Sequence, residues 1–327
     1  MAKIKRDFDG KLDDLGDLHH FLGMEVVRDR KRGILDVNIN SYILDVLERF
    51  NMSHANGKTT PLPVDGLATK RDCPDSNTEE GRAEIEEMKK KEYRALIGAL
   101  LWIHRTCVPS IAYSVHHLSM FSNNPGVKHW RQAQGILKYL KHHVDSNDPN
   151  ADVGPLGLGL RFSRASPLDL EGYVDASFAD NYGDQHENRR STTGWCFKLG
   201  GSLISWRAQK QSTVATSTAE AEYMAAFEAA KEAVYLRRLL SELGESTPTA
   251  CVPLHEDSQA CIKIATNPCL AERTKHFDIK YHWLRDKVKE KAVELRYIST
   301  HDQIADLLTK SLGPRQHAKL RTQMTGM

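Results

Sequence analysis

The order of apolar segments in the second half of the chain limits its fold more than any other feature. Three short runs of strand-like composition come first, then one long helical pattern, and then helices and strands in alternation. The expected strands are 170–175, 193–199, 203–206, 251–255 and 293–298, and the expected helices are 217–243, 258–265, 276–289 and 303–312. This order predicts an α/β domain, a mixed sheet with helices on its faces.

The first half of the chain follows a different pattern. Apolar runs on either side of residues 30–33 predict a hairpin, and Ser41 is expected to begin a helix. Residues 93–143 show three apolar helix faces and predict a small helical unit. Residues 58–91, rich in proline and then in acidic side chains, indicate a linker, and 145–155 indicate a second one.

Composition places the chain among soluble globular proteins. Its 327 residues suffice for two domains, and 40% are hydrophobic and 27% charged. The six cysteines form no C-x-x-C pair and no zinc spacing, which favours reduced thiols inside a cell. No apolar run is long enough for a membrane span, so we expect a soluble intracellular protein of the cytoplasm or nucleus with no membrane partner.

Net charge is only +2, but its distribution is uneven. Between residues 93 and 143 the charged side chains are all basic, and six histidines lie among them. A surface of one sign suits contact with phosphates, whereas a solvated helix face would need no partner. Charge alone favours neither interpretation.

Four carboxylates stand at informative places in the predicted order of elements. Asp175 ends the first strand, Glu222 lies early in the long helix, Asp257 follows the fourth strand, and Asp306 lies in the last helix. Such positions can converge at one edge of a sheet. Two Mg²⁺ ions ~3.5–4 Å apart, held by carboxylates, are a common device for phosphodiester hydrolysis. Apart from Asp175, which ends an apolar run, each acid alone would more simply be a surface carboxylate, so the hypothesis needs all four.

Several sequence blocks occur in a fixed order between residues 172 and 312. They are 173–177, 190–195, 204–211, 217–225, 273–276 and 303–306. This series closely resembles the ribonuclease H domain of copia-type retrotransposon Pol polyproteins. The resemblance implies a five-stranded mixed sheet with helices on both faces, two Mg²⁺ (or Mn²⁺) ions as cofactor, and cleavage of the RNA strand of an RNA–DNA hybrid.

The resemblance also implies site residues. The metal-binding acids correspond to Asp175, Glu222, Asp257 and Asp306, and residues 222–226 favour Glu222 over Glu220. His301 could match a histidine of the cellular enzymes, but its spacing to Asp306 is shorter, and a surface-loop histidine is an equally good interpretation.

Enzymes of this kind read the hybrid by backbone shape and 2′-hydroxyl groups. The expected contacts lie in four segments of the chain. They are Arg190, Ser191, Thr192, Lys210, Gln259, Arg273, Lys275 and His276.

Residues 13–143 are similar to the part of the same polyproteins that follows the polymerase active site. The predicted organisation is the end of the palm and start of the thumb (1–57), an acidic linker (58–91), a helical thumb and connection (92–144), a linker with a first strand (145–169), the ribonuclease H domain (170–313) and a tail (314–327). The sequence Tyr173-Val174-Asp175 continues with Ala176 rather than a second Asp, so we expect no polymerase activity. The expected partner is the upstream reverse transcriptase portion of the polyprotein.

Two alternatives stay open. The chain could be a catalytically silent nucleic-acid-binding remnant, and the departure from the family pattern at residues 106–111 suggests a decayed copy. It could also be an integrase-like or resolvase-like nuclease on the same fold, although Glu222 and the Asp-Ser-Gln run at 257–259 favour ribonuclease H.

Overall fold

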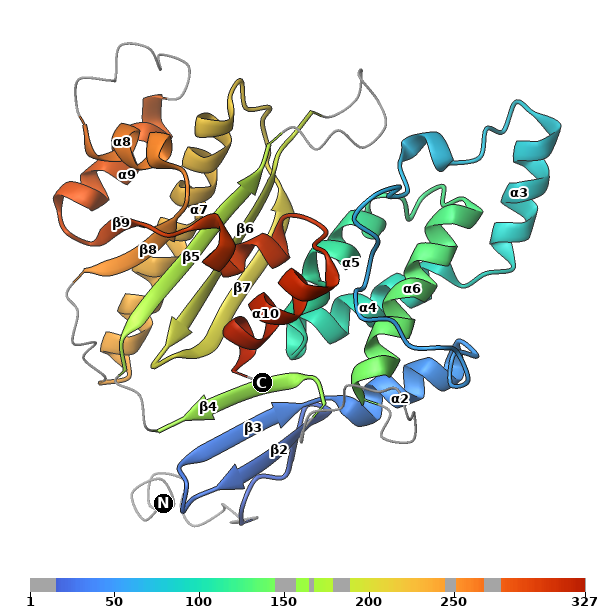
Figure 1. Ribbon diagram of the computed structural model, residues 1–327, viewed down its shortest axis with the longest axis horizontal. Coiled ribbons are helices and arrows are strands. Elements are labelled where there is room, and N and C mark those ends of the chain that lie inside the picture. The colour runs from blue at the N-terminus through green and yellow to red at the C-terminus, as the bar shows by residue number, and fades with distance from the viewer. Residues whose placement is uncertain are drawn as a thin grey trace, which may run out of the picture.

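The computed structural model describes residues 16–144, 157–164, 168–178, 189–244, 251–267 and 278–326. It contains two sheets, a four-stranded sheet in the order β1-β2-β3-β4 and a five-stranded sheet in the order β7-β6-β5-β8-β9. A group of helices lies beside both sheets (Figure 1). The α/β fold class predicted from the sequence is confirmed.

The small sheet is antiparallel throughout. Its strands are β1 (His20–Phe21), β2 (Met24–Asp29), β3 (Ile34–Asn38) and β4 (Gly159–Ser163). The predicted hairpin around residues 30–33 is present. The strand expected before the ribonuclease H domain, β4, pairs with β3 of this sheet, and Arg161 forms a 2.8 Å ion pair with the buried Asp36 across that pairing.

The helical unit has a single apolar core. It consists of α2 (Asn40–Arg49), α3 (Glu79–Lys89), α4 (Tyr93–Thr106), α5 (Ala112–Ser119) and α6 (Val127–Val144), with short 3-10 turns at Lys70–Asp72 and Pro109–Ile111. Fully buried aliphatic side chains from α2, α4 and α6 pack together in it. Most of these side chains lie at the apolar positions that predicted the helices.

The segment 58–91 is more ordered than the predicted linker. It contains α3, whose first turn is capped by the Thr78 hydroxyl, which accepts a hydrogen bond from the Gly81 amide. Leu62, Leu67 and Met88 are buried in the helical core. The sequence prediction missed this packing because the buried apolar side chains are widely spaced and show no helical period.

The large sheet combines antiparallel and parallel pairs. Strands β5 (Leu170–Ser177), β6 (Thr192–Leu199) and β7 (Ser202–Lys210) are antiparallel neighbours, and β8 (Val252–Glu256) and β9 (Val293–Tyr297) run parallel to β5. One face packs against α7 (Thr218–Glu242), α8 (Gln259–Thr266) and α9 (Asp278–Lys289). The other face packs against a short 3-10 segment and the C-terminal helix (Figure 1). Both faces are therefore covered, as the resemblance implied.

The C-terminal region differs from the prediction. In place of a helix over 303–312, the chain forms two 3-10 segments, η5 (Thr300–Asp302) and η6 (Ile304–Leu308), because Gln303 between them has non-helical backbone angles. The predicted tail then forms α10 (Pro314–Thr325), which begins at a Gly-Pro pair. Leu320 and Met324 of α10 are fully buried, so this helix is part of the core.

Helix α10 and η6 join the two halves of the molecule. Their apolar side chains form one cluster with Ala112 of α5, Leu160 of β4 and Cys196 of β6. The Trp206 indole also donates a 3.0 Å hydrogen bond to the His104 carbonyl of α4. The described part of the chain contains no helix with the length and apolar character needed to cross a membrane.

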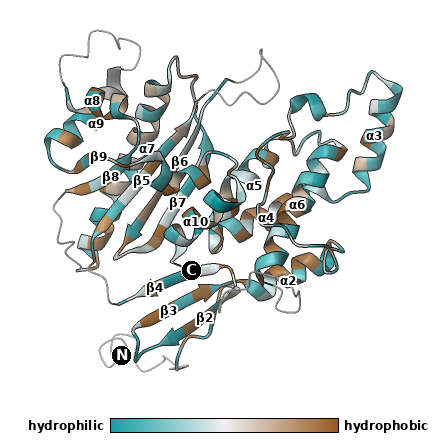
Figure 2. Cartoon of the chain, in the orientation of Figure 1, coloured by the Kyte–Doolittle hydropathy of each residue, from teal (hydrophilic) through white to brown (hydrophobic). Residues whose placement is uncertain are grey.

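One apolar edge stays exposed. Leu18, Phe21, Leu22 and Val27 on and beside β1 and β2 are each at least half exposed, and Figure 2 shows apolar residues along this hairpin. The β1–β2 edge of the small sheet thus carries apolar side chains at the protein surface.

Candidate metal centre

Three carboxylates meet at one edge of the large sheet. Asp175 lies near the end of β5, Glu222 in the second turn of α7 and Asp257 just after β8, and one oxygen from each lies within 4.8 Å of the other two. Asp175 and Glu222 are buried, at 2% and 8% exposure. The structure thus brings together three of the four acids that the sequence singled out.

The parallel strands β5 and β8 place two of these acids. Their pairing joins Gly172 to Leu254 and Tyr173 to His255, so both strands end at the same edge. Beyond these pairs the Gln303 side-chain amide donates hydrogen bonds to the carbonyls of Val174 (2.9 Å) and His255 (3.2 Å). Gln303 is fully buried, and its amide joins the two strands just before Asp175 and Asp257.

Glu220 and Glu222, both near the beginning of α7, have different contacts. Ser217 caps the helix by accepting a hydrogen bond from the Glu220 amide (3.2 Å), and the Glu220 carboxylate accepts one from the Thr216 amide (2.7 Å). Glu220 is therefore occupied in capping. Glu222, half a turn further along, faces Asp175 and Asp257, which supports the preference for Glu222 made from the sequence.

Asp306 lies beside this group of three rather than within it. The Lys310 ammonium lies 2.9 Å from Asp306 Oδ1 and 3.7 Å from Asp175 Oδ2, so it bridges the two acids. The neighbouring Thr309 hydroxyl donates a hydrogen bond to Asp175 Oδ2, and the Thr300 hydroxyl donates one to Asp257 Oδ2 at 2.7 Å. Thr309 and Thr300 thereby fix the orientation of two metal-ligating candidates.

The acids of the site are crowded, so their charged forms would be stabilised by additional positive charge. Burial, reinforced by the negative charge of Asp175 and then of Glu256, raises the pKa of Glu222 well above its usual value. Burial and the charge of Asp175 also raise the pKa of Asp306 to about 7, even though Lys310 opposes the shift. Crowded, desolvated carboxylates hold protons in this way unless a cation neutralises them.

A divalent cation fits these residues. Glu222 Oε2 is buried and accepts no hydrogen bond from the described residues, and one carboxylate oxygen of Glu222 lies close to those of Asp175 and Asp257. Mg²⁺ and Mn²⁺ prefer oxygen ligands of this kind. Asp175, Glu222 and Asp257 are therefore the residues that could hold one.

A fifth acid, Glu256, lies next to the site and was not predicted from the sequence. Its side chain is fully buried, Oε1 accepts a hydrogen bond from the Ser258 amide at 3.0 Å, and Oε2 has no partner among the described residues. Burial raises the pKa of Glu256 well above its usual value. Its position could have indicated this role, because Glu256 ends an apolar strand and directly precedes Asp257.

The predicted nucleic-acid contacts need correction. Ser191 and Thr192 are buried at the beginning of β6, so their side chains face the protein interior and not a ligand. Arg190 and Gln259 are exposed, and the Lys210 ammonium donates a 3.0 Å hydrogen bond to the Arg190 carbonyl. Arg273, Lys275 and His276 lie outside the described residues.

His301 is exposed in η5, next to Thr300. Its carbonyl accepts hydrogen bonds from Gln316 and Lys319, both at 3.0 Å. In the described residues no hydrogen bond or ion pair connects its ring to the acids. These contacts fit a surface-loop histidine as well as a proton carrier, and the role of His301 stays a prediction.

The histidines and the charged side chains of the stretch 93–143 differ in exposure: Arg94, Arg105 and Arg131 are exposed, whereas four of the six histidines are buried. His104, His117, His129 and His143 are buried, and burial lowers the pKa of His104 to about 4. A neutral, buried imidazole cannot attract phosphates. The interpretation of this stretch as a phosphate-facing surface is therefore wrong for these histidines, because the sequence could not show which helix faces pack inward.

Several known proteins with similar sequences are retrotransposon polyproteins. The chain is 37% identical over 329 residues to the retrovirus-related Pol polyprotein from transposon TNT 1-94 of Nicotiana tabacum. The aligned region covers 100% of this chain and 23% of that protein. It is 33% identical over 302 residues to the Pol polyprotein from transposon RE1 of Arabidopsis thaliana, covering 91% of this chain and 18% of that one. The chain thus spans about a fifth of the length of these relatives.

Comparison with family models found no match. Among solved structures, an N-terminal RNase H domain from Mycobacterium tuberculosis is similar at 12% identity and a TM-score of 0.30, over 48% of this chain and 97% of that one. The sequence identity to these polyproteins extends over almost the whole chain. The chain belongs to the family of copia-type retrotransposon Pol polyproteins.

Proposed function

We propose that the chain is a metal-dependent endonuclease that hydrolyses the RNA strand of RNA–DNA hybrids. The observation that carries the proposal is the meeting of Asp175, Glu222 and Asp257 at the edge of a five-stranded mixed sheet. The relatives named above are retrovirus-related Pol polyproteins, which is consistent with a nuclease of this kind.

Two Mg²⁺ or Mn²⁺ ions are the proposed cofactor. The first would bind to Asp175, Glu222 and Asp257, and the second between Asp175 and Asp306. When bound, such a pair activates a water molecule and stabilises the leaving oxygen of the phosphodiester. The protein's own contribution is to hold Asp175 through Thr309 and Asp257 through Thr300 while the sheet and α7 exclude water from one side.

The hybrid would lie across this edge of the sheet. Arg190, Lys210 and Gln259 are the described candidates to contact its backbone, and Arg273, Lys275 and His276 stay proposals from the sequence. The upstream reverse transcriptase portion of the polyprotein is the proposed partner, and the cytoplasm or nucleus the proposed location. We expect no polymerase activity from this chain.

A cleavage assay with the full chain tests the proposal. With Mg²⁺ and a uniformly labelled RNA–DNA hybrid, the unmodified chain should release short RNA fragments and leave the DNA strand and plain duplex DNA intact. Asp175→Asn and Asp257→Asn should each lower the rate at least about a hundredfold, because each removes a charged ligand of the metal. Hybrid binding, measured by fluorescence anisotropy, should change little.

Asp302→Asn is the matched control. Asp302 is an exposed acid close in sequence to the site, and it pairs with Lys319 at 2.7 Å rather than with the cluster. Its cleavage rate should stay near that of the unmodified chain. Hybrid binding without any cleavage by the unmodified chain would instead favour the silent remnant, and cleavage of duplex DNA would favour an integrase-like nuclease.

A further inference from the structure

The geometry points to Lys310 as an internal competitor for the second divalent cation. Its ammonium occupies the position between Asp175 and Asp306 and must leave before an ion can bind there. The inference rests on the proposed function, since it concerns the same metal centre, and it adds an order of binding. The first ion binds without displacing any side chain, and the second must replace Lys310.

The contacts of Lys310 resemble those of a bound cation. Its Nζ atom lies 2.9 Å from Asp306 Oδ1 and 3.7 Å from Asp175 Oδ2, on carboxylates that come from different elements of the fold. In the described part of the chain it is the one basic side chain ion-paired with any of the four acids. One ammonium thus carries the charge compensation of both Asp175 and Asp306.

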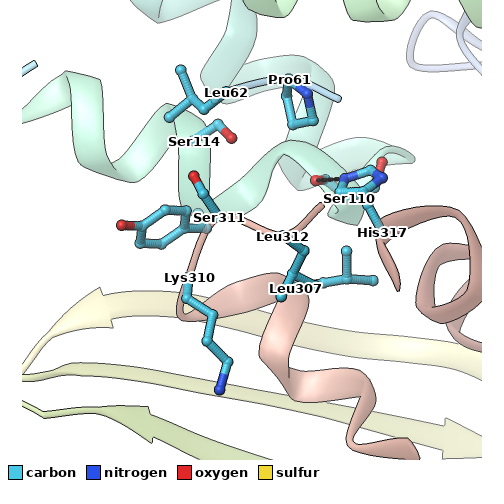
Figure 3. Close-up of a pocket in the computed structure, with 10 residues that line it drawn as sticks. Pro61, Leu62, Ser110, Ser114, Leu307, Lys310, Ser311, Leu312 and His317 are labelled. Atoms are coloured by element: carbon cyan, nitrogen blue, oxygen red, sulfur yellow. Dashed lines mark hydrogen bonds between the residues drawn. The ribbon is translucent and has the colours of Figure 1, made fainter. Parts of the chain in front are cut away.

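The surroundings of Lys310 allow its ammonium to move away from Asp175 and Asp306. The residue follows η6 in the turn before α10, and its side chain is 35% exposed although the two acids are buried. Figure 3 shows Lys310 extending from this turn toward the strands of the sheet, away from Pro61 and Leu62 on the other side of a small pocket. A lysine side chain has a flexible four-carbon stem, so the ammonium can move into solvent without movement of the backbone.

Charge explains why the two cations exclude each other. An ammonium and a divalent ion cannot both occupy the space between Asp175 and Asp306, because two cations so close together would repel strongly in a partly desolvated site. A divalent ion brings one more positive charge than the ammonium, so it can displace Lys310 at sufficient concentration. The displaced ammonium would then be free to approach the phosphates of a bound strand.

Counting bound Mn²⁺ in the full chain without nucleic acid tests the competition. Free Mn²⁺ is measured by its electron paramagnetic resonance signal at fixed pH and salt. The unmodified chain should bind one ion tightly and a second at least about tenfold more weakly. In Lys310→Met the second ion should bind roughly tenfold or more tightly than in the unmodified chain, because the competing charge is gone.

Two variants serve as controls. Lys310→Arg keeps the charge and should bind the second ion as weakly as the unmodified chain. Lys319→Met removes a neighbouring lysine that pairs with the exposed Asp302 and should change neither ion. Equal affinity of both ions in the unmodified chain, or an unchanged second affinity in Lys310→Met, would overturn the inference.

A second measurement needs no variant. Acetylation of Lys310 by acetic anhydride, followed by mass spectrometry, should become several times faster at Mn²⁺ concentrations that fill the second position, with Lys319 as internal reference. No change in the Lys310 rate under those conditions would overturn the inference. Absence of any Mn²⁺ binding would contradict the proposed metal centre. Metal-dependent cleavage in a chain whose Lys310 does not compete with the second ion would contradict only the role of Lys310.

Discussion

Gly194 lies directly opposite Asp175 in the antiparallel pairing of β5 and β6, under the segment that carries Asp306 and Thr309. A Cβ atom at Gly194 would come within 2.6 Å of the Thr309 side chain and 2.8 Å of the Leu308 side chain. The absence of a side chain at this one position therefore allows η6 to approach Asp175. The metal centre depends on this close contact between backbone segments.

Gly194→Ala should push η6 away from the sheet. We expect a loss of about 1–3 kcal/mol in the free energy of unfolding, which is typical of overpacking, and a marked fall in metal-dependent cleavage because Asp306 moves from Asp175. Urea denaturation and the hybrid cleavage assay measure the two effects. Gly98→Ala is the control, since Gly98 is an exposed residue of α4 with open space around it, and there alanine should stabilise by up to ~1 kcal/mol.

Gln303→Met should loosen the sheet edge that carries Asp175 and Asp257. The substitution removes two hydrogen bonds to buried carbonyls of β5 and β8, and we expect a loss of about 2–3 kcal/mol in unfolding free energy together with weaker Mn²⁺ binding. Gln316→Met, which removes an exposed amide that donates to the His301 carbonyl, should change stability by less than ~0.5 kcal/mol. Equal effects of the two substitutions would contradict this role of Gln303.

The contribution of Asp306 to the stability of the metal-free protein should fall as the pH rises from about 4 to about 7, whereas the lowered pKa values of the buried His104 and His317 act in the opposite direction. The pKa of Asp306 is about 7 in the folded chain against 3.8 for the free side chain, so the folded state binds more protons across this window. A raised pKa of this kind contributes stability at low pH that is lost as the pH passes through the folded value. The raised pKa of Glu222 acts in the same direction.

Thermal unfolding in a chelator at a series of pH values measures this dependence. Relative to Asp306→Asn, the unmodified chain should lose melting temperature as the pH rises over this window, because the neutral amide of the variant has no proton to lose. Saturating Mg²⁺ should reduce this loss, since the ion favours the deprotonated acids. A difference between the two chains that does not change between pH 5 and pH 7 in the chelator would show that the acids are not crowded as described.

Glu222→Gln and Glu220→Gln should have opposite consequences although they lie two residues apart on α7. Glu222→Gln should remove most of the stabilisation by Mn²⁺, which reaches about 2.7 kcal/mol at a hundredfold excess over the dissociation constant for a single site. The metal-free protein should become no less stable, because a buried charge is lost. Glu220→Gln should keep the response to Mn²⁺ but cost about 1 kcal/mol through the weakened helix cap.

Calorimetric melting with and without Mn²⁺ distinguishes the pair. A response to Mn²⁺ that survives in Glu222→Gln but is lost in Glu220→Gln would reverse the assignment of the two glutamates. The two variants are well matched, because both side chains are buried and lie in the first two turns of the same helix.

Much of this molecule could be predicted from its sequence. The strands and long helix of the second domain, and the placement of Asp175, Glu222 and Asp257 at element ends, follow from hydrophobic period and the positions of charged residues. These are local properties, since a period of two or of 3.6 residues is visible in a short window of sequence. The fold class and three of the converging acids were therefore predictable.

Other features depended on partners distant in the chain. Sequence pattern shows that a face is buried but not what covers it, so the burial of His117, the pairing of β4 with β3 and the packing of α10 became visible only in the folded chain. Gln303 breaks the last predicted helix because its amide bonds to two strands more than 40 residues away.

The sequence by itself determined which acids this protein has and at which element ends they stand. Only the tertiary structure decided that Glu220 caps a helix while Glu222 faces the other acids, and that Lys310 holds the space between Asp175 and Asp306. The physical reason is that the charge of a side chain is fixed by its residue type. Its electrostatic role depends on which other charges lie within a few ångströms, and those come from remote parts of the chain.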